Sequence, residues 1–206
     1  DYFNLSDKKI RYFEHRVICF IDHYNFDGKD IEVTQDMKLI IAGTYVMLTF
    51  GMRNYLLELF ENIIIYPTPY YSRINDAYHK GEYNPRMKTV VFSWEDFLSG
   101  HQTKDNINLG LHEFTHVLHF YSRKSSQPGA AIFHDEFTEI EKYFDDEYLA
   151  NKLKEKNYFR DYAYTNKFEF LAVILEHFFE TPEIFKKEFP ELFERVKLMI
   201  NYNDQV

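Results

Sequence analysis

The stretch His112-Glu113-Phe114-Thr115-His116 decides how this chain is interpreted. Two histidines four residues apart lie on one face of an α-helix and can bind one metal ion together. A glutamate directly after the first histidine lies near the open side of such an ion, where it can accept a proton from water. The stretch therefore predicts a metal-binding helix with His112 and His116 as ligands and Glu113 as a general base.

The helix that carries this motif is expected to begin at Asp105 or Asn106, both good N-cap residues, and to continue to Tyr121. Apolar residues recur at helical spacing in the first sixty residues, which predicts helices there as well. The other expected helices run over residues 135–154, 166–180 and 192–202.

Only two segments are typical of buried strands: Ile63-Ile64-Ile65-Tyr66 and residues 89–94. Residues 70–86 are polar, contain Gly81 and Pro85, and are expected to form a loop or hairpin. Many helices and few strands predict an α+β fold that is mostly helical, with a small sheet. We expect residues 1–206 to form one domain, with a helical part at 1–60 and a catalytic core at 61–206.

Composition excludes some functions. The chain has 24 Lys and Arg against 33 Asp and Glu, a formal charge of −9, which disfavours nucleic-acid binding. The one cysteine, Cys19, excludes an intramolecular disulfide and is expected to be a buried, inert thiol. No apolar run approaches the roughly 20 residues that span a bilayer, and no signal peptide is visible. A cytoplasmic monomer is expected.

A catalytic zinc ion takes three protein ligands and leaves one position for water. In one class of site the third ligand is a histidine six residues after the second, but Ser122 occupies that position here. In another class it is a glutamate from a later helix. The residues that qualify are Glu136, Glu139, Glu141, Glu169, Glu176 and Glu180.

Glu169 and Glu176 are seven residues apart and share one helix face, with the small Ala172 between them. Two carboxylates beside apolar residues favour an inward orientation with a partner. An alternative for Glu169 is equally well supported, because Asn166 to Glu169 has the spacing of a capping box. We expect Glu176 to orient a ligand histidine rather than to bind the metal.

Several ordered blocks beyond the motif resemble one family. They comprise residues 36–38, 41–42, 65–67, 91–94, 108–116, 162–166, 169–173 and 176–179. The chain resembles the bacterial zinc peptidases of the Mlc titration factor A family, the glucose-regulated metallopeptidases. That family is distantly related to the catalytic domain of anthrax lethal factor. The resemblance covers most of the chain and implies a zincin-like peptidase fold.

The resemblance also implies that His112 and His116 bind zinc, that Glu169 is the third ligand and that Tyr162 is catalytic. Glu113 is again the general base. The chain departs from the family pattern at His119, where the family carries an aspartate. On packing grounds alone Tyr162 would be a core aromatic, and no residue identifies a binding surface for the family's repressor partner.

The leading hypothesis is a zinc-dependent peptidase that acts on peptide or protein substrates. One strand is expected to present an edge near the cleft, close to residues 89–94, and residues 130–133 are expected to form an apolar loop over it. The alternative is a zinc-fold protein that sequesters a regulatory protein partner, with weak or vestigial hydrolysis. A helical interaction module with an accidental motif is the third hypothesis.

Overall fold

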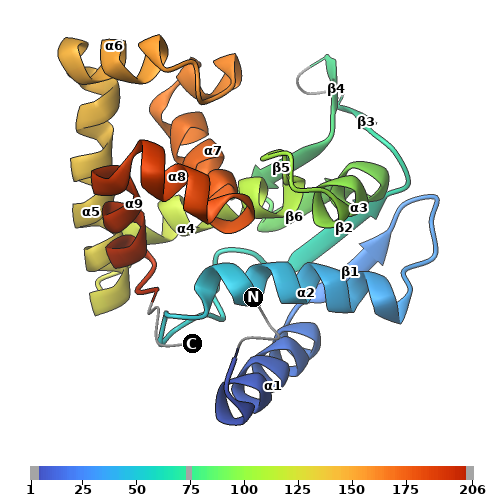
Figure 1. Ribbon diagram of the computed structural model, residues 1–206. Helices are drawn as coiled ribbons and strands as arrows, with labels where there is room; N and C mark the ends of the chain where they lie inside the picture. Colours follow the sequence, from blue (N-terminus) through green and yellow to red (C-terminus); the bar gives the residue numbers. More distant parts are fainter. Residues whose placement is uncertain (1–4, 73–75, 203–206) are drawn as a thin grey trace.

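A small mixed β-sheet lies beside a larger assembly of helices in the computed structural model, which describes residues 5–72 and 76–202 (Figure 1). The helices are α1 (Asp7–His23), α2 (Gln35–Thr49), α3 (Trp94–Gln102), α4 (Leu109–Lys124), α5 (Pro128–Asp145), α6 (Glu147–Glu155), α7 (Lys167–Glu180), α8 (Pro182–Glu188) and α9 (Pro190–Met199), with a 3₁₀ turn η2 (Asp161–Tyr164) before α7. The strands are β1 (Asn25–Gly28), β2 (Asn62–Tyr66), β3 (Tyr70–Ser72), β4 (Ala77–His79), β5 (Gly81–Asn84) and β6 (Thr89–Ser93). The predicted α+β class, mostly helical with a small sheet, is confirmed.

Four strands form the main sheet, in the order β1-β2-β6-β5. β1, β2 and β6 run parallel, whereas β5 is antiparallel to β6. Ile63 lies opposite Val90 and Ile65 opposite Phe92, and all four side chains are buried, as expected for apolar strands covered by helices. β5 ends the sheet, and no strand within the described residues pairs with its outer edge. β5 also contacts α4.

The strands predicted at 63–66 and 89–94 are confirmed as β2 and β6, except that Trp94 begins α3. Ser93 ends the strand and caps that helix, because its Oγ accepts a hydrogen bond from the Asp96 N–H. The segment predicted as a loop or hairpin holds the β3–β4 hairpin and also the edge strand β5, which was not predicted.

Helix α4 lies at the centre of the molecule, between the sheet and the helices α5 to α9 (Figure 1). Phe114 points into the core, with its ring centroid 5.4 Å from that of Phe92 and 4.9 Å from that of Tyr45. Asn108 caps the helix by accepting the Leu111 N–H at 3.0 Å. The helix thus begins a few residues later than predicted. Its contacts with the core fix the orientation of the helix and therefore of its histidine face.

Other boundaries were predicted wrongly. The long helix expected over 135–154 is two helices, because the side chain of Asp146 accepts the Leu149 N–H and starts α6. Residues 130–133 are no loop over a cleft: they belong to α5, where Ala130 and Phe133 are buried in the core. Cys19 is partly exposed rather than buried, with Sγ 3.5 Å from Nε2 of His15. Of the helices in the described ranges, none is long and apolar enough to cross a membrane.

Candidate metal centre

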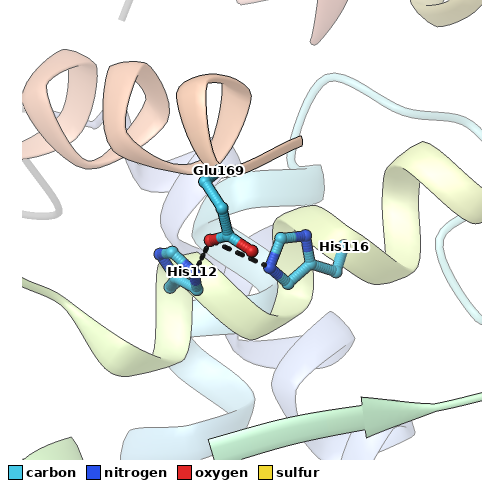
Figure 2. Close-up of side chains that lie close together, drawn as sticks. All are labelled: His112, His116 and Glu169. Carbon is cyan, nitrogen blue, oxygen red and sulfur yellow. Dashed lines mark hydrogen bonds and ion pairs between the residues drawn. The ribbon is translucent and has the colours of Figure 1, made fainter. Parts of the chain in front are cut away.

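Two helices meet at the histidine motif, and together they form one cluster of ligand atoms (Figure 2). His112 and His116 lie one turn apart on α4, and Glu169 lies in the first turn of α7. Oε2 of Glu169 is 2.8 Å from Nε2 of His112 and 3.7 Å from Nε2 of His116. One ligand atom from each residue lies within 4.8 Å of the others, and no second group of this kind occurs in the described ranges. Two imidazole nitrogens and one carboxylate oxygen are a donor set typical of catalytic zinc.

The orientation of Glu169 separates the two hypotheses that the sequence left open. Asn166 caps α7, because its Oδ1 accepts the N–H groups of Phe168 at 2.9 Å and of Glu169 at 3.1 Å. The carboxylate of Glu169 points toward the two histidines (Figure 2), and the α7 cap contains no capping box. Asn166 therefore accounts for the cap, and the Glu169 side chain remains available as a ligand.

The three ligand residues differ in charge because their partners differ. Burial lowers the pKa of His112, but hydrogen bonds to Glu169 and Glu176 outweigh it and raise the pKa to about 10. Burial and the charge on His112 lower the pKa of His116 to about 4. Burial opposes ionisation of Glu169, yet the hydrogen bond from His112 and the charge of the histidines hold its pKa below the usual value. Without a metal, His112 thus carries a proton on each ring nitrogen and donates to Glu176 through Nδ1 and to Glu169 through Nε2.

Glu113 lies beside this cluster, buried between α4 and the edge strand β5. It is 6% exposed, and the Tyr83 backbone N–H donates a hydrogen bond to its carboxylate. Burial raises the pKa of Glu113 to about 7, with the nearby Glu169 adding to the shift and His112 opposing it. A carboxyl group with a pKa near neutrality can both accept and return a proton.

Glu176 makes the contact that the sequence suggested for it. Its Oε1 is 2.7 Å from Nδ1 of His112, on the side of the ring that faces away from the cluster. A ligand histidine commonly donates its second N–H to a carboxylate, which fixes the tautomer and the ring orientation. His112 therefore presents Nε2 to the cluster.

Tyr162 lies in η2, five residues before the start of α7. Its ring centroid is 5.8 Å from that of His112, and its hydroxyl is hydrogen-bonded to Glu169. Burial and the charge of Glu169 raise the pKa of this phenol, so the hydroxyl keeps its proton at neutral pH. With 49% of its surface exposed, the side chain is a poor candidate for a core aromatic.

Comparison with known proteins agrees with this geometry. The profile of the family described as glucose-regulated metallo-peptidase M90 matches residues 2–200. The chain belongs to this family. A comparison with curated proteins found no match. Membership in the M90 family, together with the cluster of His112, His116 and Glu169, makes this a metallopeptidase fold with a candidate metal centre.

An open groove lies along one side of the candidate metal centre. The groove is lined by residues from β5, α4 and the start of α7: Tyr83, Pro85, His116, His119, Phe120, Arg123, Asn166, Phe168 and Glu169. Two of the three ligand residues line it, so the centre is accessible from this side.

Two other histidines near the centre are not ligands in this arrangement. His119 packs between the rings of Phe137 and Phe168, at centroid distances of 4.9 and 4.5 Å. His177 packs among aromatic rings such as Tyr158, and burial lowers its pKa to about 4. These aromatic surroundings are typical of structural side chains.

Sequence reasoning missed two residues that shape the centre. Gly81 on β5 lies against Glu113, where an added Cβ would be 2.8 Å from the carboxylate oxygen Oε1. Arg160 forms an ion pair with Glu176, with Nη1 2.7 Å from Oε2. Neither contact could be predicted from neighbouring residues, because Gly81 lies in a polar segment and Arg160 lies among aromatic residues.

Proposed function

We propose that this chain is a zinc-dependent peptidase in which His112, His116 and Glu169 hold the metal ion. The observation that carries this proposal is the approach of these three ligand atoms to within 4.8 Å, with Glu113 buried beside them. Zinc is the ion that suits two neutral imidazoles and one carboxylate with an open position. A zinc ion held there supplies Lewis acidity, which acidifies water and polarises a peptide carbonyl.

In this proposal Glu113 accepts a proton from the attacking water and delivers it to the leaving amine. Burial raises its pKa to about 7 in the metal-free protein, which makes it a stronger base than an exposed carboxylate. A bound cation favours the carboxylate form and brings this pKa below 7, so the base is ionised at neutral pH. The hydrogen bond from the Tyr83 N–H holds the carboxylate in place before the substrate arrives.

Tyr162 and β5 have the substrate-facing roles. The Tyr162 hydroxyl, protonated at neutral pH, donates a hydrogen bond to the carbonyl oxygen as negative charge develops on it. An extended peptide lies in the groove beside His116, next to Tyr83 and Pro85 at the end of β5. Peptides and unfolded protein segments, which offer a free strand, are therefore the expected substrate class.

Metal analysis combined with peptide cleavage tests the proposal. Wild type and Glu113→Gln are each expected to hold about one zinc ion per chain, as a single catalytic site requires. His112→Ala removes a ligand and is expected to lose the metal. Glu113→Gln is expected to lower kcat by about 10²–10⁴-fold, because only the base is removed.

His101→Ala is the matched control, since this histidine is exposed in the last turn of α3, and it should change neither readout. Full zinc content in His112→Ala would place the metal elsewhere and contradict the proposed ligand set. Equal cleavage by wild type and Glu113→Gln would reject the enzyme hypothesis. Zinc binding without measurable cleavage of any peptide in a mixed library would instead favour the sequestering protein.

A further inference from the structure

A buried ion pair lies behind His112, on the side away from the metal cluster. Glu176 is fully buried on α7, and the guanidinium of Arg160 meets it with two contacts, Nη1–Oε2 at 2.7 Å and Nη2–Oε1 at 2.9 Å. This is the bidentate arrangement that only arginine can make. A carboxylate removed from water needs such a partner, because an unpaired buried charge is strongly destabilising.

One oxygen of Glu176 is shared between the arginine and the histidine. Oε1 lies 2.7 Å from Nδ1 of His112 and 2.9 Å from Nη2 of Arg160. The two donors fix the plane of the carboxylate and leave Nδ1 of His112 as the protonated nitrogen. Nε2 is then the nitrogen that faces the cluster. The orientation of the ligand thus depends on a residue that makes no contact with the cluster's own ligand atoms.

The same group of residues anchors the segment that leads into α4. Arg160 Nη1 also donates to the Asn106 carbonyl oxygen, and the Asn108 N–H lies 3.3 Å from Oε2 of Glu176. Glu180, one turn further along α7, accepts the Asn106 N–H at 2.6 Å and the Asn108 Nδ2 at 3.0 Å. Arg160 therefore links the segment before α4, through Asn106, to helix α7, through Glu176.

We propose that Arg160 is a positioning residue for the metal centre, which acts through Glu176 to hold His112 in its metal-binding orientation. The inference rests on the metal site of the proposed function. It assigns to Arg160 an effect on metal affinity that a purely structural ion pair would not have. Carboxylate partners of ligand histidines typically change metal affinity about 10–100-fold when they are lost.

Zinc affinity, measured by competition with a chromophoric chelator, tests this without reference to peptide cleavage. Arg160→Gln is expected to weaken zinc binding about 10–100-fold. Arg160→Lys keeps the charge but cannot make the bidentate contact, so its zinc affinity should lie between those of Arg160→Gln and wild type. Arg195→Gln is the matched control: Arg195 pairs with Glu136 at 3.0 Å, away from the centre, and its loss should leave zinc affinity unchanged.

A double-mutant cycle with Glu176→Gln tests whether Arg160 acts through that carboxylate. If it does, the double variant binds zinc no more weakly than Glu176→Gln alone. Losses that multiply would overturn the proposal, as would an Arg160→Gln variant that loses thermal stability but keeps wild-type zinc affinity. If Arg160→Gln does not fold, Arg160→Lys decides, and unchanged affinity there overturns the proposal. Failure of wild type to bind zinc would instead reject the metal centre itself.

Discussion

Gly81 and Glu113 approach so closely that a Cβ atom on Gly81 would lie 2.8 Å from Oε1 and 2.9 Å from Cγ of Glu113. The edge strand β5 and the helix α4 can contact each other at this distance only because position 81 has no side chain. The contact buries the carboxylate on which the proposed chemistry depends. It also explains why an edge strand contains a glycine, which is otherwise unfavourable in a strand.

Gly81→Ala is therefore expected to displace Glu113 and to lower kcat by about 10²-fold, since small misplacements of a catalytic group have effects of this size. Zinc content should not change, because the added methyl group faces Glu113 and Leu109 rather than the ligands. Gly43→Ala in α2 is the control: its Cβ would have no atom within 4 Å, and alanine should stabilise the helix by about 0.5–1 kcal/mol. Wild-type kcat in Gly81→Ala would show that this contact does not position the base.

Tyr162→Phe tests the proposed hydrogen bond to the reacting carbonyl. The three ligand residues are kept, so the variant should still hold about one zinc ion at saturating metal. Its kcat should fall about 10²–10³-fold, as for the loss of one oxyanion donor. Tyr164→Phe, in the same 3₁₀ turn, is the matched control, because its buried hydroxyl has no hydrogen-bond partner in the described structure. A similar fall in kcat in both variants would indicate that the fall results from disturbing the 3₁₀ turn and not from losing the Tyr162 hydroxyl.

The sequence predicted the parts of the centre that depend on local spacing. His112 and His116 are four residues apart, so any helix places them on one face. Glu169 and Glu176 share a face of α7 for the same reason, and the inward direction of both followed from their apolar neighbours. The strands β2 and β6 were predictable because β-branched residues recur without interruption.

The parts that were missed depend on contacts between segments distant in the chain. β5 is short and polar, and it becomes a strand only because β6 offers it an edge. Arg160 stands among aromatic residues, and its partner is sixteen residues further along the chain. Asp146 divides a helical pattern that periodicity alone would continue, because its side chain caps the next helix.

The proton on His112 leads to a prediction about metal binding. In the metal-free protein its pKa is raised to about 10, since hydrogen bonds to Glu169 and Glu176 outweigh the effect of burial. His112 is therefore protonated at pH 8, and zinc must displace that proton from Nε2. The pKa of His116 is lowered to about 4 by burial, so it contributes none. Calorimetric titration with zinc in buffers of different ionisation enthalpy should detect at least about one proton released from the protein at pH 8.

The raised pKa of His112 also determines how the stability of the metal-free fold changes with pH. A histidine whose pKa is higher in the folded than in the unfolded state stabilises the fold fully below the unfolded value of about 6.5. This contribution is lost as pH rises from there through the folded value of about 10. Between pH 7 and 10, metal-free wild type should thus lose more stability than metal-free His112→Ala. Absence of proton release on zinc binding, or parallel stability curves, would contradict this assignment.

The segment entering α4 offers a last prediction, because Asn106 has φ of 62°, in the left-handed region. Its backbone N–H binds Glu180 and its Oδ1 accepts from Thr181, so the conformation is fixed by contacts on both sides. Asn106→Ala and Asn106→Gly lose the same side-chain bond, but only alanine is strained at positive φ. Asn106→Ala should be less stable than Asn106→Gly by about 1 kcal/mol in urea unfolding of the metal-free protein. Equal stability of the two variants would mean that the segment relaxes to another conformation in Asn106→Ala. Zinc affinity of that variant should then fall, because Arg160 and Glu180 both bind the backbone of Asn106.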